Sequence, residues 1–207
     1  MSYDKSDAAQ DEFYDALRRE LHEELKEEAI AAFTADRLKS FYVHRPDVMR
    51  PAVDAIQEGN WQQSNQRHSA ALIFHVSAIE LLLKATLLKP VIYGLVHNDA
   101  LAEVVVKHTL GQTGFDRYNG LLAELFVTLA KVDLNNIERH GQSKKLLDEC
   151  SALQSLRNKV IHQGATSTAG EAETARLVAV AVFDMIVQPM LHSLGLTVIE
   201  KGEIIEA

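Results

Sequence analysis

The sequence predicts an all-α protein, an antiparallel bundle of about five to seven helices. Glycine and proline are scarce, with 10 and 4 residues among 207, and they fall between periodic segments rather than inside them. Apolar side chains recur with helical spacing, and 47% of the residues are apolar, which is ample for a core. The single cysteine, Cys150, excludes a disulfide framework and fits a small core residue in a reducing compartment.

Residues 1–45 are expected to form an acidic helical extension to a helical domain spanning residues 46–207. The first helix is predicted over residues 8–33, where apolar residues recur at a spacing of about 3.5. Residues 1–30 contain ten acidic and four basic residues, a local charge of −6 in a chain whose net charge is −8. This acidic surface fits either a solvated helix face or an arm that binds a partner.

The most apolar segment, residues 61–89, is expected to be the central buried helix, ended by Pro90 and Gly94. A short helix over residues 47–58, stopped by Gly59, is expected to precede it.

A narrow polar stripe interrupts the apolar surface of this central helix. Ser77, Glu80 and Lys84 follow one another at i, i+3 and i+7, and Glu80 and Lys84 have the spacing of a helical ion pair. The stripe fits either an internal ion pair or one wall of a cleft.

The second half of the chain predicts four more helices joined by short connections: one after Asp99, then residues 115–131, 142–163 and 171–193. The 142–163 helix is expected to be capped near Ser143 and to end at Gly164, a residue suited to a left-handed C-terminal cap. The last helix is expected to bend or end near Pro189, and a strand is possible in residues 194–207.

The sequence offers no membrane anchor and no secretion signal. The N-terminus is charged from the fourth residue, and no uncharged apolar run of about 18 residues is present. We therefore expect a soluble, cytoplasmic protein with no membrane partner.

One short motif near the end of the 142–163 helix points to chemistry. Arg157 is followed directly by Asn158 and, five positions on, by His162. On a helix Asn158 and His162 are one turn apart, and the long Arg157 side chain can reach the same space. A guanidinium that forks onto phosphate, beside an imidazole that exchanges protons near neutral pH, suits phosphodiester chemistry.

This motif resembles the signature of the HEPN superfamily, in which Arg is followed by four to six residues and a His, commonly with a polar residue directly after the Arg. The Ser-Ala-Ile-Glu-Leu-Leu-Leu-Lys run of the central helix is similar to the family's other core helix, and the resemblance covers about residues 60–193. It implies a metal-independent endoribonuclease without a cofactor, with Arg157, Asn158 and His162 as catalytic residues. It also implies a homodimer in which two such helices face each other and form a composite site.

The expected reaction is attack of the ribose 2′-hydroxyl on the adjacent phosphorus, which leaves a 2′,3′-cyclic phosphate and a 5′-hydroxyl. Arg157 would stabilise the developing charge and His162 would act as acid or base, with Asn158 orienting His162 or a phosphate oxygen. Ser77, Glu80 and Lys84 are assigned a supporting role. The need for a 2′-hydroxyl makes RNA the expected substrate.

The resemblance further implies a toxin or defence component with a cognate antitoxin or regulatory protein as partner. Family members paired with a nucleotidyltransferase antitoxin often carry a tyrosine two positions after the His, where this chain has Gly164. The surroundings of the motif suit RNA, because residues 131–167 contain six basic and four acidic residues.

Two non-catalytic interpretations stay open. A HEPN-like module that binds nucleotide, RNA or a partner protein fits the acidic first helix. A structural bundle, in which Arg157 and His162 cap the helix and pair with Asp148 or Glu149, fits as well.

A second Arg–His pair, Arg37 and His44, meets the bare spacing with six residues between. Leu38 follows Arg37, however, and the segment shows no clear amphipathic periodicity, so no function is assigned to this pair.

Overall fold

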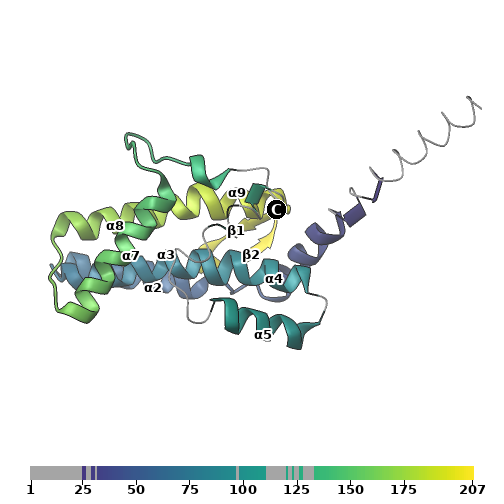
Figure 1. Cartoon of the computed structure of the whole chain (residues 1–207), viewed down its shortest axis with the longest axis horizontal. Helices are drawn as coiled ribbons and strands as arrows, with labels where there is room; N and C mark the ends of the chain where they lie inside the picture. Colours follow the sequence, from purple (N-terminus) through teal and green to yellow (C-terminus); the bar gives the residue numbers. More distant parts are fainter. Residues whose placement is uncertain are drawn as a thin grey trace, which may run out of the picture.

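The described residues form a helical bundle with one small β-hairpin, and the prediction of an all-α bundle is confirmed. The computed structural model describes residues 25–26, 29–30, 32–96, 98–110, 120, 123, 126–127 and 133–207. Most of the predicted helices over residues 8–33 and 115–131 lie outside these residues. Helices α2 (Arg50–Ser64), α3 (His68–Leu81) and α8 (Ala169–Val182) pack together, and α7 (Leu146–Gln163) crosses them obliquely (Figure 1).

The central helix does not end at Pro90, as the sequence predicts, but continues to Leu95. It consists of α3, a π-helical segment (Leu82–Leu88) and α4 (Lys89–Leu95). Proline lacks an N–H, and its ring collides with the carbonyl four residues before it, so a wider turn ahead of Pro90 relieves both problems. The chain repeats this solution at Pro189, where a π-helical segment (Phe183–Val187) joins α8 to α9 (Gln188–Ser193).

A helix over residues 32–44 packs on the central helix. Leu38 and Tyr42 are fully buried in the main hydrophobic cluster, so this helix does have an apolar face, contrary to the sequence prediction. Because Pro90 has no N–H, the carbonyl of Thr86 lacks its α-helical donor, and Tyr42 Oη donates a hydrogen bond to that oxygen at 2.6 Å. The last part of the expected N-terminal extension thus contributes to the core of residues 46–207.

Helix α2 continues through Gly59, where the sequence predicts a stop. Gly59 is buried against the imidazole of His75 on α3, and a Cβ atom at Gly59 would lie 2.4 Å from His75 Cδ2. Close approach of two helices therefore requires this glycine. His75 itself is fully buried with Nε2 3.2 Å from Asn60 Oδ1, and burial lowers the pKa of its imidazole.

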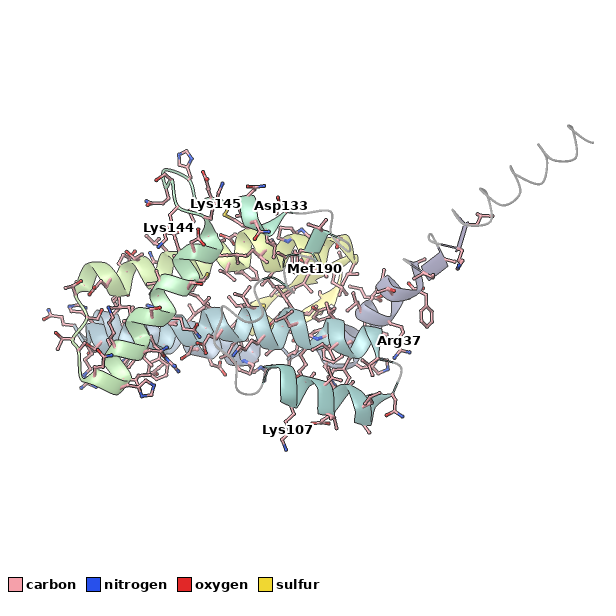
Figure 2. The ribbon with its side chains drawn as sticks, viewed as in Figure 1. Arg37, Lys107, Asp133, Lys144, Lys145 and Met190 are labelled. Carbon is pink, nitrogen blue, oxygen red and sulfur yellow. The ribbon has the colours of Figure 1, made fainter. Side chains whose placement is uncertain are left out.

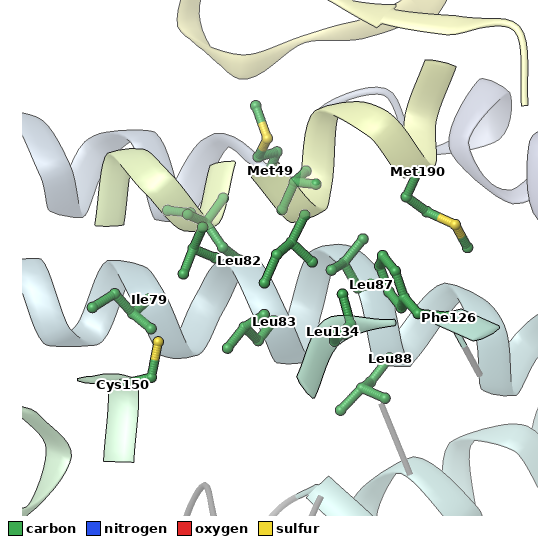
Figure 3. Close-up of a cluster of buried hydrophobic side chains, with 14 of the residues drawn as sticks. Met49, Ile79, Leu82, Leu83, Leu87, Leu88, Phe126, Leu134, Cys150 and Met190 are labelled. Carbon is green, nitrogen blue, oxygen red and sulfur yellow. The ribbon is translucent and has the colours of Figure 1, made fainter. Parts of the chain in front are cut away.

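The π-helical segment supplies much of the core. Its leucines join a cluster with Phe126 and with side chains from α7, α9 and the 3₁₀ turn Leu134–Asn136 (Figure 3). The figure labels Met49, Ile79, Leu82, Leu83, Leu87, Leu88, Phe126, Leu134, Cys150 and Met190. Cys150 is a core residue, as predicted, and burial raises the pKa of its thiol to about 12. It is therefore an unreactive packing residue.

The remaining elements lie near the α4 and α9 end of the bundle (Figure 1). Helix α5 (Asp99–Leu110) begins where the sequence predicts, after Asp99. The tail forms the antiparallel hairpin β1 (Leu196–Val198) and β2 (Ile204–Glu206), confirming a strand in this region. Ile204 N–H donates to the carbonyl of Pro46 at 2.9 Å, which ties the hairpin to the start of the domain.

Two helical stretches, His68–Gly94 and Ala169–Ser193, are long and apolar enough to cross a membrane, with mean hydropathies of 1.8 and 1.5. In their most apolar windows 61% and 44% of the residues are buried inside the bundle. Core burial accounts for such a composition equally well. The part of the chain that the structure describes holds no further candidate span, so it gives no sign of a protein with many membrane spans.

Candidate functional site

Helix α7 carries the Arg157–His162 motif, and its two ends differ in how they are capped. Its N-cap is Lys145, not a residue near Ser143 as predicted, and no side chain caps it. It ends as predicted at Gly164, whose left-handed backbone (φ 67°, ψ 20°) sends its N–H back to the carbonyl of Lys159. A backbone N–H, rather than the side chain of Arg157 or His162, therefore bonds to one of the carbonyls at the end of α7.

Arg157 and Asn158 contact each other directly. Arg157 Nη1 donates to Asn158 Oδ1 at 3.2 Å. The Arg157 side chain is half-buried, and its Nε atom is shielded from solvent without a hydrogen-bond acceptor. Among the described residues it has no carboxylate partner, so its charge is available to an anion.

His162 lies in the last turn of α7 and is exposed. Five residues of α-helix rotate it by about 140° from Arg157. No hydrogen bond of the His162 side chain, to Arg157 or to any other residue, is found within the described residues. Asn158 lies between the two in angle and is exposed as well.

The predicted supporting residues have different surroundings. Glu80 Oε1 accepts a hydrogen bond from Gln154 Nε2 at 2.8 Å, which ties the central helix to α7 one turn before Arg157. Ser77 Oγ donates to the carbonyl of Ile73 in its own helix at 2.8 Å and holds nothing on α7. Lys84 is half-buried and belongs to the π-helical segment.

The C-terminal half of α7 has a positive surface. Residues 150–170 contain Arg157 and Lys159 and no aspartate or glutamate. The nearest acid before them, Glu149, is held by Arg139 in two hydrogen bonds of 2.6 and 2.8 Å, so it does not pair with Arg157. Lys144 and Lys145 lie at the other end of the helix (Figure 2). An anion can therefore approach the motif without meeting a carboxylate from this segment.

A pocket that the sequence analysis missed lies between the 32–44 helix and α4. It has a volume of about 350 Å³ and is lined by Arg37, Ser40, Phe41, His44, Arg45 and Tyr93. The sequence does contain a sign of this pocket: Arg37 and His44 are seven positions apart, and residues with that spacing lie on one face of a helix. Its aromatic wall includes Tyr93, almost fifty positions further along the chain, which no local pattern reveals.

No cluster of His, Cys, Asp and Glu that could hold a metal ion occurs within the described ranges. Comparison of the chain with models of known families, with curated proteins and with solved structures finds no match.

Proposed function

We propose that the protein is a metal-independent endoribonuclease of the HEPN type, with Arg157, Asn158 and His162 acting on RNA. The observation that carries the proposal is the carboxylate-free half of α7, where Asn158 holds Arg157 and His162 is exposed in the last turn. Cleavage of a phosphodiester needs a cation at the phosphate and a group that exchanges protons with the ribose or the leaving oxygen. This segment supplies both.

The reaction needs only the groups of the chain and the RNA. O2′ attacks the phosphorus while a base takes its proton, the P–O5′ bond breaks, and an acid protonates O5′. His162 takes one of these proton-transfer roles, and Arg157 binds the non-bridging oxygens as their charge grows. Asn158 positions Arg157 through the 3.2 Å contact. The products are a 2′,3′-cyclic phosphate and a 5′-hydroxyl.

A second copy of the chain completes this site. Arg157 and His162 point away from one α7 helix at about 140° to each other, so one chain offers each phosphate only one of them. In a two-fold dimer Arg157 of one copy and His162 of the other face the same phosphate. Short side chains at Ala152 and Ser155 on the exposed side of α7 permit close approach of the second helix.

The family resemblance adds a cellular role to the proposal. It favours a cytoplasmic toxin or defence component held in check by a cognate antitoxin or regulatory protein. Gly164 replaces the tyrosine that serves as the modified residue in one subgroup, so inhibition would not use that modification.

A non-catalytic module that binds RNA, nucleotide or a partner protein is the second candidate. The separation of Arg157 from His162 favours it, because a single chain can bind phosphate through Arg157 without placing a proton donor beside it.

The test is cleavage of total RNA or tRNA by the full chain in EDTA, with mapping of the product ends. Arg157→Ala and His162→Ala should each lower the rate by about 100-fold or more. His192→Ala is the matched control, since His192 is also an exposed histidine in the last turn of a helix. Unchanged rates in both variants, or no cleavage of any RNA by the wild type, would contradict the proposal. Binding without cleavage would support the second candidate.

A further inference from the structure

The pocket lined by the 32–44 helix and α4 is a cationic cavity far from α7. Arg37 lies where the 32–44 helix meets α4, in Figure 2. The end of α7 lies at the opposite end of the central helix, because Ser167 N–H donates to Ser69 Oγ at 2.9 Å. Ser69 and Tyr93 are 24 residues apart on this helix, which corresponds to roughly 35 Å. The pocket and the α7 motif are therefore separate sites.

Among the described residues, the two arginines of the pocket have no acidic partner. Its lining includes Arg37, His44 and Arg45 and no carboxylate, and neither arginine takes part in an ion pair within the described residues. Arg37 Nε is shielded from solvent without a hydrogen-bond acceptor. Two arginines without a described counter-charge, one of them with an unused donor, favour an anionic ligand.

His44 is held in a fixed orientation. Its Nδ1 lies 2.8 Å from the carbonyl of Ser40, an oxygen that can only accept, so Nδ1 carries the hydrogen. The other ring nitrogen, Nε2, carries a hydrogen only in the protonated ring, and it is in that form that it can donate to a phosphate oxygen. Arg37 and His44 are seven residues apart on one helix, which leaves only about 20° between their directions.

Arg45 provides a planar surface in the same pocket. Its guanidinium carbon lies 4.8 Å from the centre of the Phe41 ring and 4.9 Å from that of Tyr93. The two rings, 5.4 Å apart, hold the guanidinium by cation–π contact and leave the exposed side of Arg45 open. A guanidinium plane stacks well on a nucleobase.

We propose that this pocket binds a mononucleotide, with its phosphate on Arg37 and His44 and its base stacked on Arg45. The volume of about 350 Å³ suits a ligand larger than phosphate alone and lies at the lower end of small-molecule sites. Arg37 suits the phosphate of a nucleotide, and the Arg45 guanidinium, held by the two aromatic rings, suits its base. This proposal stands independently of ribonuclease activity at α7.

The experiment is calorimetric titration of the full chain with AMP, adenosine, ribose 5-phosphate and inorganic phosphate. AMP should bind with one site per chain, and adenosine, ribose 5-phosphate and inorganic phosphate should each bind about 10-fold or more weakly, because each lacks one of the two parts. Equal affinity for ribose 5-phosphate and AMP would overturn the nucleotide assignment. No binding of AMP at millimolar concentration would overturn the site altogether.

Variants locate the binding. Arg37→Ala and Arg45→Ala should each weaken AMP by about 10- to 100-fold, and Arg37→Lys should weaken it too, because lysine lacks the forked donors. Arg67→Ala is the matched control, since Arg67 is exposed and lies 5.7 Å from the Trp61 ring outside the pocket. Thermal unfolding of each variant checks the fold. If Arg157→Ala abolishes AMP binding while Arg37→Ala and Arg45→Ala do not, the pocket is the wrong site.

Discussion

Replacing Tyr42 with phenylalanine tests how the N-terminal helix is joined to the bundle. The ring and its buried volume are kept, so no cavity forms, but the carbonyl of Thr86 loses the hydroxyl that donates to it at 2.6 Å. A buried carbonyl deprived of its partner costs about 1–3 kcal/mol in the free energy of unfolding. Urea unfolding followed by circular dichroism measures this loss. Tyr93→Phe is the control, because no hydrogen bond of the Tyr93 hydroxyl is found in the described part of the chain, and it should change stability by less than about 0.5 kcal/mol.

A double-mutant cycle isolates the reason for the loss. Pro90→Ala removes the ring that requires the wider turn and restores an N–H, so the helix can return to α-helical pairing, in which residue 90 donates to the carbonyl of Thr86. In the Pro90→Ala background Tyr42→Phe should therefore cost less than in the wild type, by about 1 kcal/mol. Equal costs in the two backgrounds, or no cost of Tyr42→Phe in the wild type, would refute the argument that Tyr42 serves the carbonyl left open by Pro90.

Three further predictions concern the dimer, the helix packing and pH. Mixed in equal amounts, inactive Arg157→Ala and His162→Ala chains should recover about one quarter of wild-type RNA cleavage, since half the dimers are mixed and each then holds one intact composite site; no recovery would place both residues in one chain. Gly59→Ala should destabilise by about 1–3 kcal/mol in urea unfolding, because its Cβ meets a buried imidazole, whereas Gly170→Ala, with open space around it, should not. Since burial lowers the pKa of His75, the unfolded chain binds its proton first, so the stability contributed by neutral His75 is complete above a pH of about 6.5 and falls as the pH drops below that value. Urea midpoints at pH 7.5 and 5.5 should show this fall, and a His75→Gln variant should show a smaller one.

The fold class followed from the sequence because apolar periodicity records which face of each helix is buried. The errors at Gly59 and Pro90 share one cause: local rules assign glycine and proline to helix ends, whereas contacts from elsewhere in the chain decide these positions. Gly59 is required by the imidazole of His75, which lies on another helix. Pro90 is accommodated by a π-helical turn and by Tyr42, 48 residues earlier. Local helix propensity contains no information about His75 or Tyr42, because both lie far from these positions in the sequence.

The sequence predicted that the long Arg157 side chain can reach the space of Asn158 and His162, and the structure shows its contact with Asn158. The sequence could not predict how His162 is oriented, because spacing within a helix says nothing about which face meets the core. Burial of Leu153 and partial burial of Val160 turn Arg157 toward the bundle flank and His162 toward solvent. Whether an Arg–His pair forms a site therefore depends on its phase, meaning the positions of the two side chains around the helix axis relative to the buried face.

That phase separates the two Arg–His pairs of the chain. Arg157 and His162 are five positions apart on one helix, which turns their side chains about 140° from each other, and the proposed ribonuclease site therefore joins them through a second copy. Arg37 and His44 are seven positions apart, which leaves about 20° between their directions, and both line one pocket of a single chain. The site proposed for the pair that resembles a known motif thus needs two copies of the chain, whereas the site proposed for the other pair lies within one chain. To assign a site from such a motif, one must know which helix face is buried as well as how the residues are spaced. In this chain the two Arg–His pairs lie near opposite ends of the central helix, and a different chemistry is proposed for each.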